Sequence, residues 1–142
     1  MRFTEHELTA ALTGTAKAVL AQQRKDVRKG KVDLETAWEE LDRFQRYQLL
    51  DGLGTQILPV MIALPDIEVE SGTRPSFTDA QVVEAVEAQV GDEGGRLRRK
   101  AVVAARVALV RMALGYLPPR LDPDALLHHD PDDLPTGDDV GP

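Results

Sequence analysis

The chain has 142 residues, a formal net charge of -7, 4% aromatic residues and no cysteine. The absence of cysteine excludes disulfide-stabilised scaffolds, thiolate metal sites and cysteine nucleophiles. A chain of this length fits one domain, and such a domain buries roughly 70% of the surface that its unfolded chain exposes. The composition therefore predicts a single domain with an ordinary apolar core.

The negative charge is concentrated at the C-terminus. Residues 118–142 contain seven aspartates and one basic residue, Arg120, so the residues before them are nearly neutral overall. A nearly neutral body argues against general binding to a phosphate backbone and permits self-association. We therefore predict a helical domain over residues 1–117 and an acidic tail, rich in proline and aspartate, over residues 118–142.

The N-terminal part of the chain begins with a helix-start signal. Thr4 and Glu7 form a T-x-x-E capping box, and apolar residues at helical spacing follow it. This pattern predicts a first helix that begins at Thr4 and ends between residues 23 and 27. A basic stretch over residues 24–31 then leads to the next segment.

A second helix is predicted over residues 34–50, with Asp33 as its N-cap. Two acid–base pairs at i,i+4 spacing are expected on its outer face: Glu39 with Arg43, and Asp42 with Arg46. The sequence D-G-L-G at residues 51–54 predicts a break. Residues 55–64 are then expected to form a short kinked segment, because Pro59 disfavours helix in the residue before it.

Two further helices are predicted in the second half of the chain. Thr78 is the expected N-cap of a helix that continues to about Val90, with Gln81 completing its capping box. Residues 91–95 form a predicted turn. The segment over residues 96–117 is apolar on nearly every side, which predicts a helix in the centre of the fold.

These elements predict an all-α fold: a four-helix bundle-like single domain with a short kinked segment between its second and third helices. The predicted core consists of the apolar residues on the inward stripes: Leu8, Leu12, Val19, Trp38, Leu41, Phe44, Leu53, Ile57, Val82, Val86, Val103, Val107, Val110 and Leu114.

Two segments of the sequence resemble each other. Residues 3–12 and 77–86 share the pattern F-T-acid-x-(E/Q)-aliphatic-x-x-A-aliphatic. A duplicated two-helix unit would explain the pattern. So would a capping box preceded by an apolar staple residue, which occurs wherever a helix begins.

The sequence contains no recognisable catalytic or metal-binding motif. His6 has no second ligand at i+3 or i+4, and adjacent residues such as His128 and His129 are not expected to ligate one metal together. No nucleophile elbow or phosphate-binding glycine loop is present. We therefore predict no metal and no cofactor, and the sequence favours a non-enzymatic protein. An enzyme with an unrecognised carboxylate and arginine site stays an alternative.

Two basic patches, over residues 24–31 and 96–100, suggest interaction surfaces. They are compatible with a nucleic-acid-associated regulator, or with docking of the acidic tail in cis or from a second subunit. In the tail, the short apolar sequence at Leu126 and Leu127 is flanked by aspartates, as in segments that dock into a partner's groove. The alternative is a solubilising tail.

The favoured function is therefore a cytoplasmic helical interaction protein, an adaptor or small assembly subunit, that binds a protein partner or itself. The absence of cysteine and of a signal-peptide pattern fits the cytoplasm. No membrane contact is expected, because residues 101–117 are too short for a span and contain two arginines. The candidate partner-binding residues are Arg96, Arg98, Arg99, Lys100, Leu126 and Leu127.

Overall fold

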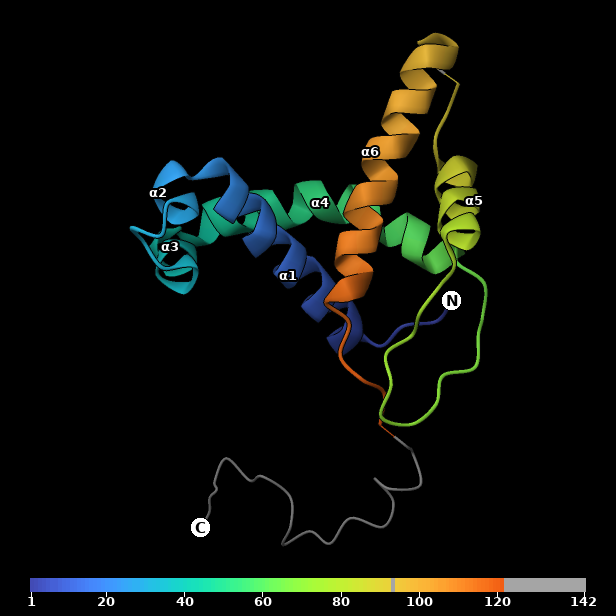
Figure 1. The fold of residues 1–142 in the computed structure, drawn as a ribbon, viewed down its shortest axis with the longest axis horizontal. Helices are drawn as coiled ribbons and strands as arrows, with labels where there is room; N and C mark the ends of the chain where they lie inside the picture. The colour runs from blue at the N-terminus through green and yellow to red at the C-terminus, as the bar shows by residue number, and fades with distance from the viewer. Residues whose placement is uncertain (93, 122–142) are drawn as a thin grey trace, which may run out of the picture.

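The computed structural model describes residues 1–92 and 94–121. Over these residues the protein is an all-helical single domain without strands (Figure 1), which confirms the predicted all-α class. Its helices are α1 (Glu5–Gln23), α2 (Lys25–Arg28), α3 (Leu34–Glu40), α4 (Arg43–Ala63), α5 (Asp79–Gln89) and α6 (Gly95–Gly115). None of these helices is long and apolar enough to cross a membrane.

The predicted starts of α1 and α5 are confirmed. The Thr4 hydroxyl accepts the Glu7 N–H at 3.1 Å, and the Glu7 carboxylate accepts the Thr4 N–H at 2.9 Å. Thr78 and Gln81 make the same reciprocal pair at the start of α5. The phenylalanines before the two caps also touch: the rings of Phe3 and Phe77 meet edge to face, with centroids 6.5 Å apart. The two similar sequence segments therefore meet through the phenylalanines that precede α1 and α5.

The predicted helix over residues 34–50 is wrong, because the chain forms two helices there. Helix α3 ends at Glu40, and Asp42 starts α4 by accepting the Gln45 N–H at 2.7 Å. Gln45 in turn accepts the Asp42 N–H at 3.0 Å, so D-R-F-Q is a capping box rather than helix interior. Neither predicted pair, Glu39 with Arg43 or Asp42 with Arg46, is among the ion pairs of the described residues. The ion pair near this junction joins Glu40 to Arg24 at 3.0 Å.

The predicted break at residues 51–54 and the separate segment over residues 55–64 are also wrong. Helix α4 continues through both glycines of D-G-L-G and through Pro59. A proline inside a helix costs about 3 kcal/mol and each glycine about 1 kcal/mol. Burial of an aliphatic side chain contributes roughly 1.5–3 kcal/mol, and Ile57, Val60 and Met61 are fully buried. Burial of α4 therefore outweighs its poor local propensity.

Two apolar clusters lie along α4. Leu53, Ile57 and Met61 pack with residues of α1 and α3, while Val60 and Leu64 pack with residues of α5 and α6. Of the predicted core residues, Trp38, Leu53, Ile57, Val82, Val86 and Val110 are buried. Half-buried beside them are Leu8, Leu12, Val19, Leu41, Val103, Val107 and Leu114. The assignment of Phe44 to the core is wrong. Phe44 is 64% exposed, because α4 begins after Asp42 and this start places Phe44 on the side of the helix that faces away from the core.

The prediction that the last helix lies in the centre holds only for its C-terminal half, which packs among α1, α4 and α5. Within α6, the residues Val110 and Ala113 are buried, and both belong to its C-terminal half. The N-terminal half extends beyond the other helices (Figure 1). Its apolar composition comes largely from alanine, and Ala101, Ala104 and Ala105 are exposed. Small side chains leave this half without enough apolar area to require burial.

An ion pair between Glu7 and Arg120 closes the fold across 113 residues of sequence. The Arg120 Nε lies 2.8 Å from Glu7 Oε2, and its Nη2 lies 3.1 Å from Glu7 Oε1 and 2.9 Å from the Arg2 carbonyl oxygen. The Arg120 backbone is also hydrogen-bonded to the loop before α5, through Gly72 and Thr73. One carboxylate thus caps α1 and anchors the segment that follows α6.

This arrangement predicts a pH-dependent contribution to stability. Burial alone would raise the pKa of Glu7, but hydrogen bonds from Arg120 and from the Thr4 N–H outweigh it and hold the pKa below its usual range. Because the pKa of Glu7 is lower in the folded state than in the unfolded state, ionised Glu7 stabilises the fold. This contribution is fully present at pH values above the unfolded-state pKa of about 4.3, and it is lost as the pH falls through the lower folded-state pKa.

We expect Glu7→Gln to lower the free energy of unfolding at pH 7 by about 2–3 kcal/mol, because it leaves the half-buried Arg120 without its charged partner. The difference from the wild type should shrink as the pH falls below about 4. Urea unfolding at several pH values measures it, with Glu5→Gln on the exposed side of the same turn as a control. A difference that is independent of pH would contradict the assignment.

Two helical glycines differ in what surrounds them. A Cβ added at Gly14 would lie 2.8 Å from the Cβ of Tyr116, so the close approach of the chain end after α6 requires glycine there. A Cβ added at Gly52, in α4, would meet nothing within 4 Å. The first glycine is a packing requirement within this fold, and the second is not.

We therefore expect Gly14→Ala and Gly52→Ala to have opposite effects on stability. Gly14→Ala should destabilise the protein by about 1–2 kcal/mol through overpacking against Tyr116. Gly52→Ala should stabilise it by about 0.4–1 kcal/mol, because alanine loses less backbone entropy on folding. Thermal unfolding in dilute solution tests both, and a loss of stability with Gly52→Ala would show that the space around Gly52 is occupied.

Candidate interaction surface

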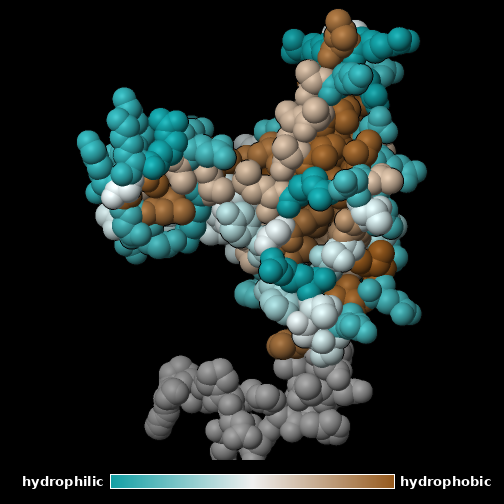
Figure 2. All heavy atoms as spheres, viewed as in Figure 1, coloured by the Kyte–Doolittle hydropathy of each residue, from teal (hydrophilic) through white to brown (hydrophobic). Residues whose placement is uncertain are grey.

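The basic residues predicted to bind a partner lie on the projecting end of α6. Arg96, Arg98 and Lys100 are exposed there. Arg99 is half-buried: its Nε lies 3.1 Å from Asp92 Oδ1 and its Nη2 donates to the Glu87 carbonyl oxygen at 3.2 Å. Figure 2 shows hydrophilic residues around this tip. The structure thus places three of the four basic residues in solvent and holds the fourth against the end of α5.

Leu126 and Leu127, the other predicted partner-binding residues, lie outside the described residues, as do His128 and His129. The basic stretch over residues 24–31 is partly used inside the fold. Arg24 pairs with Asp26 at 2.7 Å and with Glu40 at 3.0 Å, which ties α2 to α3.

The basic start of α6 opposes the helix dipole. No side chain caps the helix at Gly94, and its first turn carries no acidic residue. We expect Arg96→Glu to raise the free energy of unfolding by about 0.3–1 kcal/mol. Arg96→Gln, which removes the charge without reversing it, should give a smaller gain. Chemical denaturation at low and high salt checks this, and a gain that does not diminish with salt would contradict the dipole explanation.

A second surface, which the sequence did not reveal, lies on α4. A hollow of about 570 Å³ opens between α4 and Leu12 of α1. Its lining on α4 is mainly apolar: Tyr47, Leu50, Asp51, Gly54, Thr55, Leu58, Pro59 and Ile62. Tyr47 and Ile62 are each 62% exposed, and Phe44 at the start of the helix is 64% exposed. We call this surface the outer face of α4.

The outer face follows from the periodicity of the helix. At about 100° per residue, Phe44, Asp51 and Ile62 share one side of α4 and lie opposite the buried residues Leu53 and Val60. The helix therefore carries one apolar face inside the core and another toward solvent. Sequence reasoning missed the outer face because the predicted break at residues 51–54 divided it, and because Phe44 was assigned to the core.

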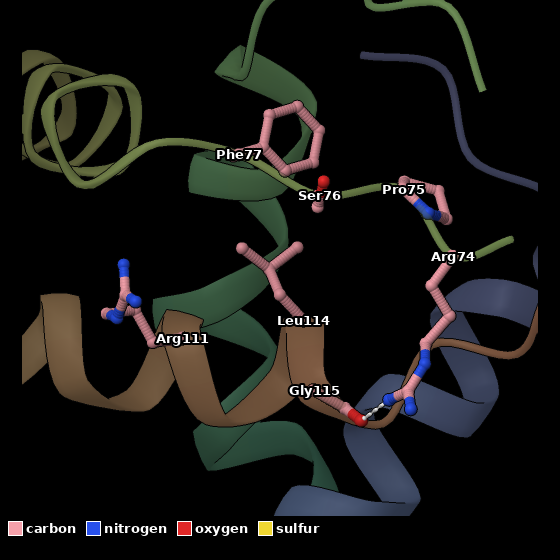
Figure 3. A pocket seen from close by; sticks show the side chains of 7 residues that line it. All are labelled: Arg74, Pro75, Ser76, Phe77, Arg111, Leu114 and Gly115. Atoms are coloured by element: carbon pink, nitrogen blue, oxygen red, sulfur yellow. Dashed lines mark hydrogen bonds between the residues drawn. The ribbon is translucent and has the colours of Figure 1, made fainter.

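A third feature is a smaller hollow of about 290 Å³ between the loop before α5 and the C-terminal half of α6 (Figure 3). It contains two arginines and one serine, Ser76. Both guanidinium groups have partners: Arg74 donates to the Gly115 carbonyl oxygen, and Arg111 pairs with Asp79. The arginines in this hollow therefore hold the loop and α5 against α6.

The described residues offer little for acid–base or metal chemistry. The carboxyl groups of Glu7 and Asp26 have lowered pKa values; hydrogen bonding to Arg24 is the main cause for Asp26, and neither group lines a hollow described above. His6 is exposed on the first turn of α1. Within residues 1–92 and 94–121, no group of three histidine, aspartate or glutamate residues is placed to hold a metal ion.

Comparison with known proteins identifies no relative. No protein-family model, no curated protein and no solved structure matches this chain.

Proposed function

We propose that the chain is a non-enzymatic, cytoplasmic helical interaction protein that binds a protein partner through the outer face of α4. The observation that carries the proposal is the exposure of Tyr47 and Ile62 around one apolar hollow, with exposed Phe44 on the same side at the start of the helix. Monomeric proteins rarely expose contiguous apolar patches larger than a few hundred Å² unless the patch binds something, whereas single exposed apolar residues are common.

The shape of the hollow favours a helical or extended apolar segment as the ligand. It runs along α4 from Tyr47 to Ile62, a rise of about 22 Å at 1.5 Å per residue. A hydrophobic groove of this kind suits an amphipathic helix with apolar residues at i, i+3 or i+4, and i+7. Tyr47 is well suited to such a contact, since tyrosine is enriched among the residues that dominate binding energy.

The second candidate is a nucleic-acid-associated regulator. It is favoured by the exposure of Arg96, Arg98 and Lys100 on the projecting end of α6. Against it, Asp92 and Arg99 form an ion pair beside these residues, which reduces the positive charge of the patch. The nearly neutral body also supplies little of the charge that binding to phosphates needs.

We expect Tyr47→Lys combined with Ile62→Lys to abolish partner binding while leaving the fold intact, because both side chains project into solvent. The test is a pull-down of the tagged full chain from source-cell lysate, with bound species identified by mass spectrometry and circular dichroism confirming the fold. The matched control replaces Arg96, Arg98 and Lys100 by glutamine and should keep the same partner.

Three outcomes separate the alternatives. Partner binding that survives the two lysines on α4 but disappears with the glutamine variant would overturn the proposal. Binding that disappears on nuclease treatment would favour the nucleic-acid candidate. Loss of every partner when the chain is stopped after Leu121, with the α4 variant binding normally, would assign the interaction to residues 122–142.

A further inference from the structure

The exposed residues of the outer face are spaced symmetrically along α4. Counting along the helix, the steps between them are three, four, four, four and three residues, and the centre of this series is Leu53. The residues are Phe44, Tyr47, Asp51, Thr55, Pro59 and Ile62, all of them exposed. Gln48 is also exposed on this side and is the exception to the symmetry, because its mirror position is the half-buried Leu58. A helix face with this symmetry matches itself when a second copy lies antiparallel across it.

From this symmetry, we infer that the partner of the outer face is α4 of a second copy of this chain, packed antiparallel about a two-fold axis near Leu53. The inference rests on the proposed function, since it names the occupant of the same surface. In this arrangement Phe44 of each copy lies against Ile62 of the other, and Tyr47 lies against Pro59. Apolar residues thus meet apolar residues at both ends of the contact.

The charges of the outer face specify the direction of packing. Asp51 is its one ionisable group besides the Tyr47 phenol. Antiparallel packing places the Asp51 carboxylate opposite the uncharged Thr55 of the other copy, whose hydroxyl donates to the Gly52 carbonyl oxygen of its own helix at 3.0 Å. Parallel packing in register would place two Asp51 carboxylates against each other, which is unfavourable. The sequence therefore suits the two-fold antiparallel arrangement and disfavours the parallel one.

The centre of the contact also permits close approach. Gly52 lies beside it, is exposed, and has open space where a Cβ would project. A glycine inside a helix costs about 1 kcal/mol, and no neighbour within this copy requires one at this position. A second helix crossing here supplies a packing reason for it. The body outside the acidic tail is nearly neutral, so two copies do not strongly repel each other there.

The size of the face indicates a weak dimer. Its length from Phe44 to Ile62 is about 27 Å, the span of one helix pair. A standard stable interface buries about 800 Å² per partner, more than the face of one helix provides. We therefore expect a dissociation constant in the micromolar range or weaker.

The test is sedimentation equilibrium of the full chain at about 0.15 M salt. At this salt concentration, repulsion between the acidic tails of two copies is largely screened beyond roughly 8 Å. The wild type should show a monomer–dimer equilibrium. Thr55→Glu places a carboxylate opposite Asp51 of the other copy in both symmetric contacts, and it should weaken the dimer tenfold or more. Asp51→Lys combined with Thr55→Glu in one chain should restore the dimer, because the introduced lysine then faces the introduced glutamate of the other copy.

A mixture of two single variants tests whether α4 itself forms the contact. Asp51→Lys mixed with Thr55→Glu should form heterodimers in preference to either homodimer. Parallel packing would also favour these heterodimers, because the introduced lysine would face the native Asp51, so the direction is decided by the double variant, in which parallel packing sets like charges against each other. Gln45→Glu adds the same negative charge to α4 away from the outer face and should leave the dimer constant unchanged. Circular dichroism of each variant checks that the fold is kept.

A wild type that stays monomeric up to several hundred micromolar would overturn the inference, as would a double variant that fails to recover the dimer lost in Thr55→Glu. These results are distinguishable from failure of the proposed function. If the chain is monomeric but the two lysine substitutions on α4 still abolish capture of another protein, the outer face binds a different partner. If neither self-association nor capture depends on α4, the proposed function fails as well.

Discussion

Burial of one face of α4 against two apolar clusters is the constraint on which the rest of the structure depends. One cluster joins α4 to α1 and α3, and the other joins it to α5 and α6. Ile57 and Val60 are fully buried in different clusters, three residues apart. A break between them, at Leu58 or Pro59, would uncouple the part of α4 that packs in one cluster from the part that packs in the other, so burial keeps the helix continuous through Pro59 despite the low helix propensity of proline.

The continuity of α4 also creates its outer face. Because the helix is not interrupted, Phe44 and Ile62 share one side over five turns, and no helix of the described chain covers that side. Hydrophobic residues gather where α6 crosses α4 (Figure 2), whereas the tip of α6 is mainly hydrophilic, with Leu97 exposed among the basic residues. The molecule therefore presents a basic end on α6 and an apolar face on α4, and the second is the better basis for a binding function.

The ends of the described chain are held together by polar contacts. The buried Glu7 carboxylate accepts one hydrogen bond from the Thr4 N–H at the start of α1 and another from Arg120, which follows α6. One carboxylate therefore connects the first helix to the segment after the last one. Removal of either partner leaves the other group partly buried and unpaired, which costs more than the pair contributes when intact. The arginines around the smaller hollow act similarly, since Arg74 and Arg111 connect the loop and α5 to α6.

The sequence by itself determined the all-α class and the starts of α1, α3 and α5, because a capping box and an N-cap involve residues three or four apart. The same local rule also marks the start of α4 at Asp42, which the longer apolar pattern obscured. Only the tertiary structure decided that α4 continues through Pro59, that α6 projects from the fold, and that Glu7 binds Arg120. Each of these depends on burial or on contacts between residues far apart in the chain, and local spacing carries no information about them.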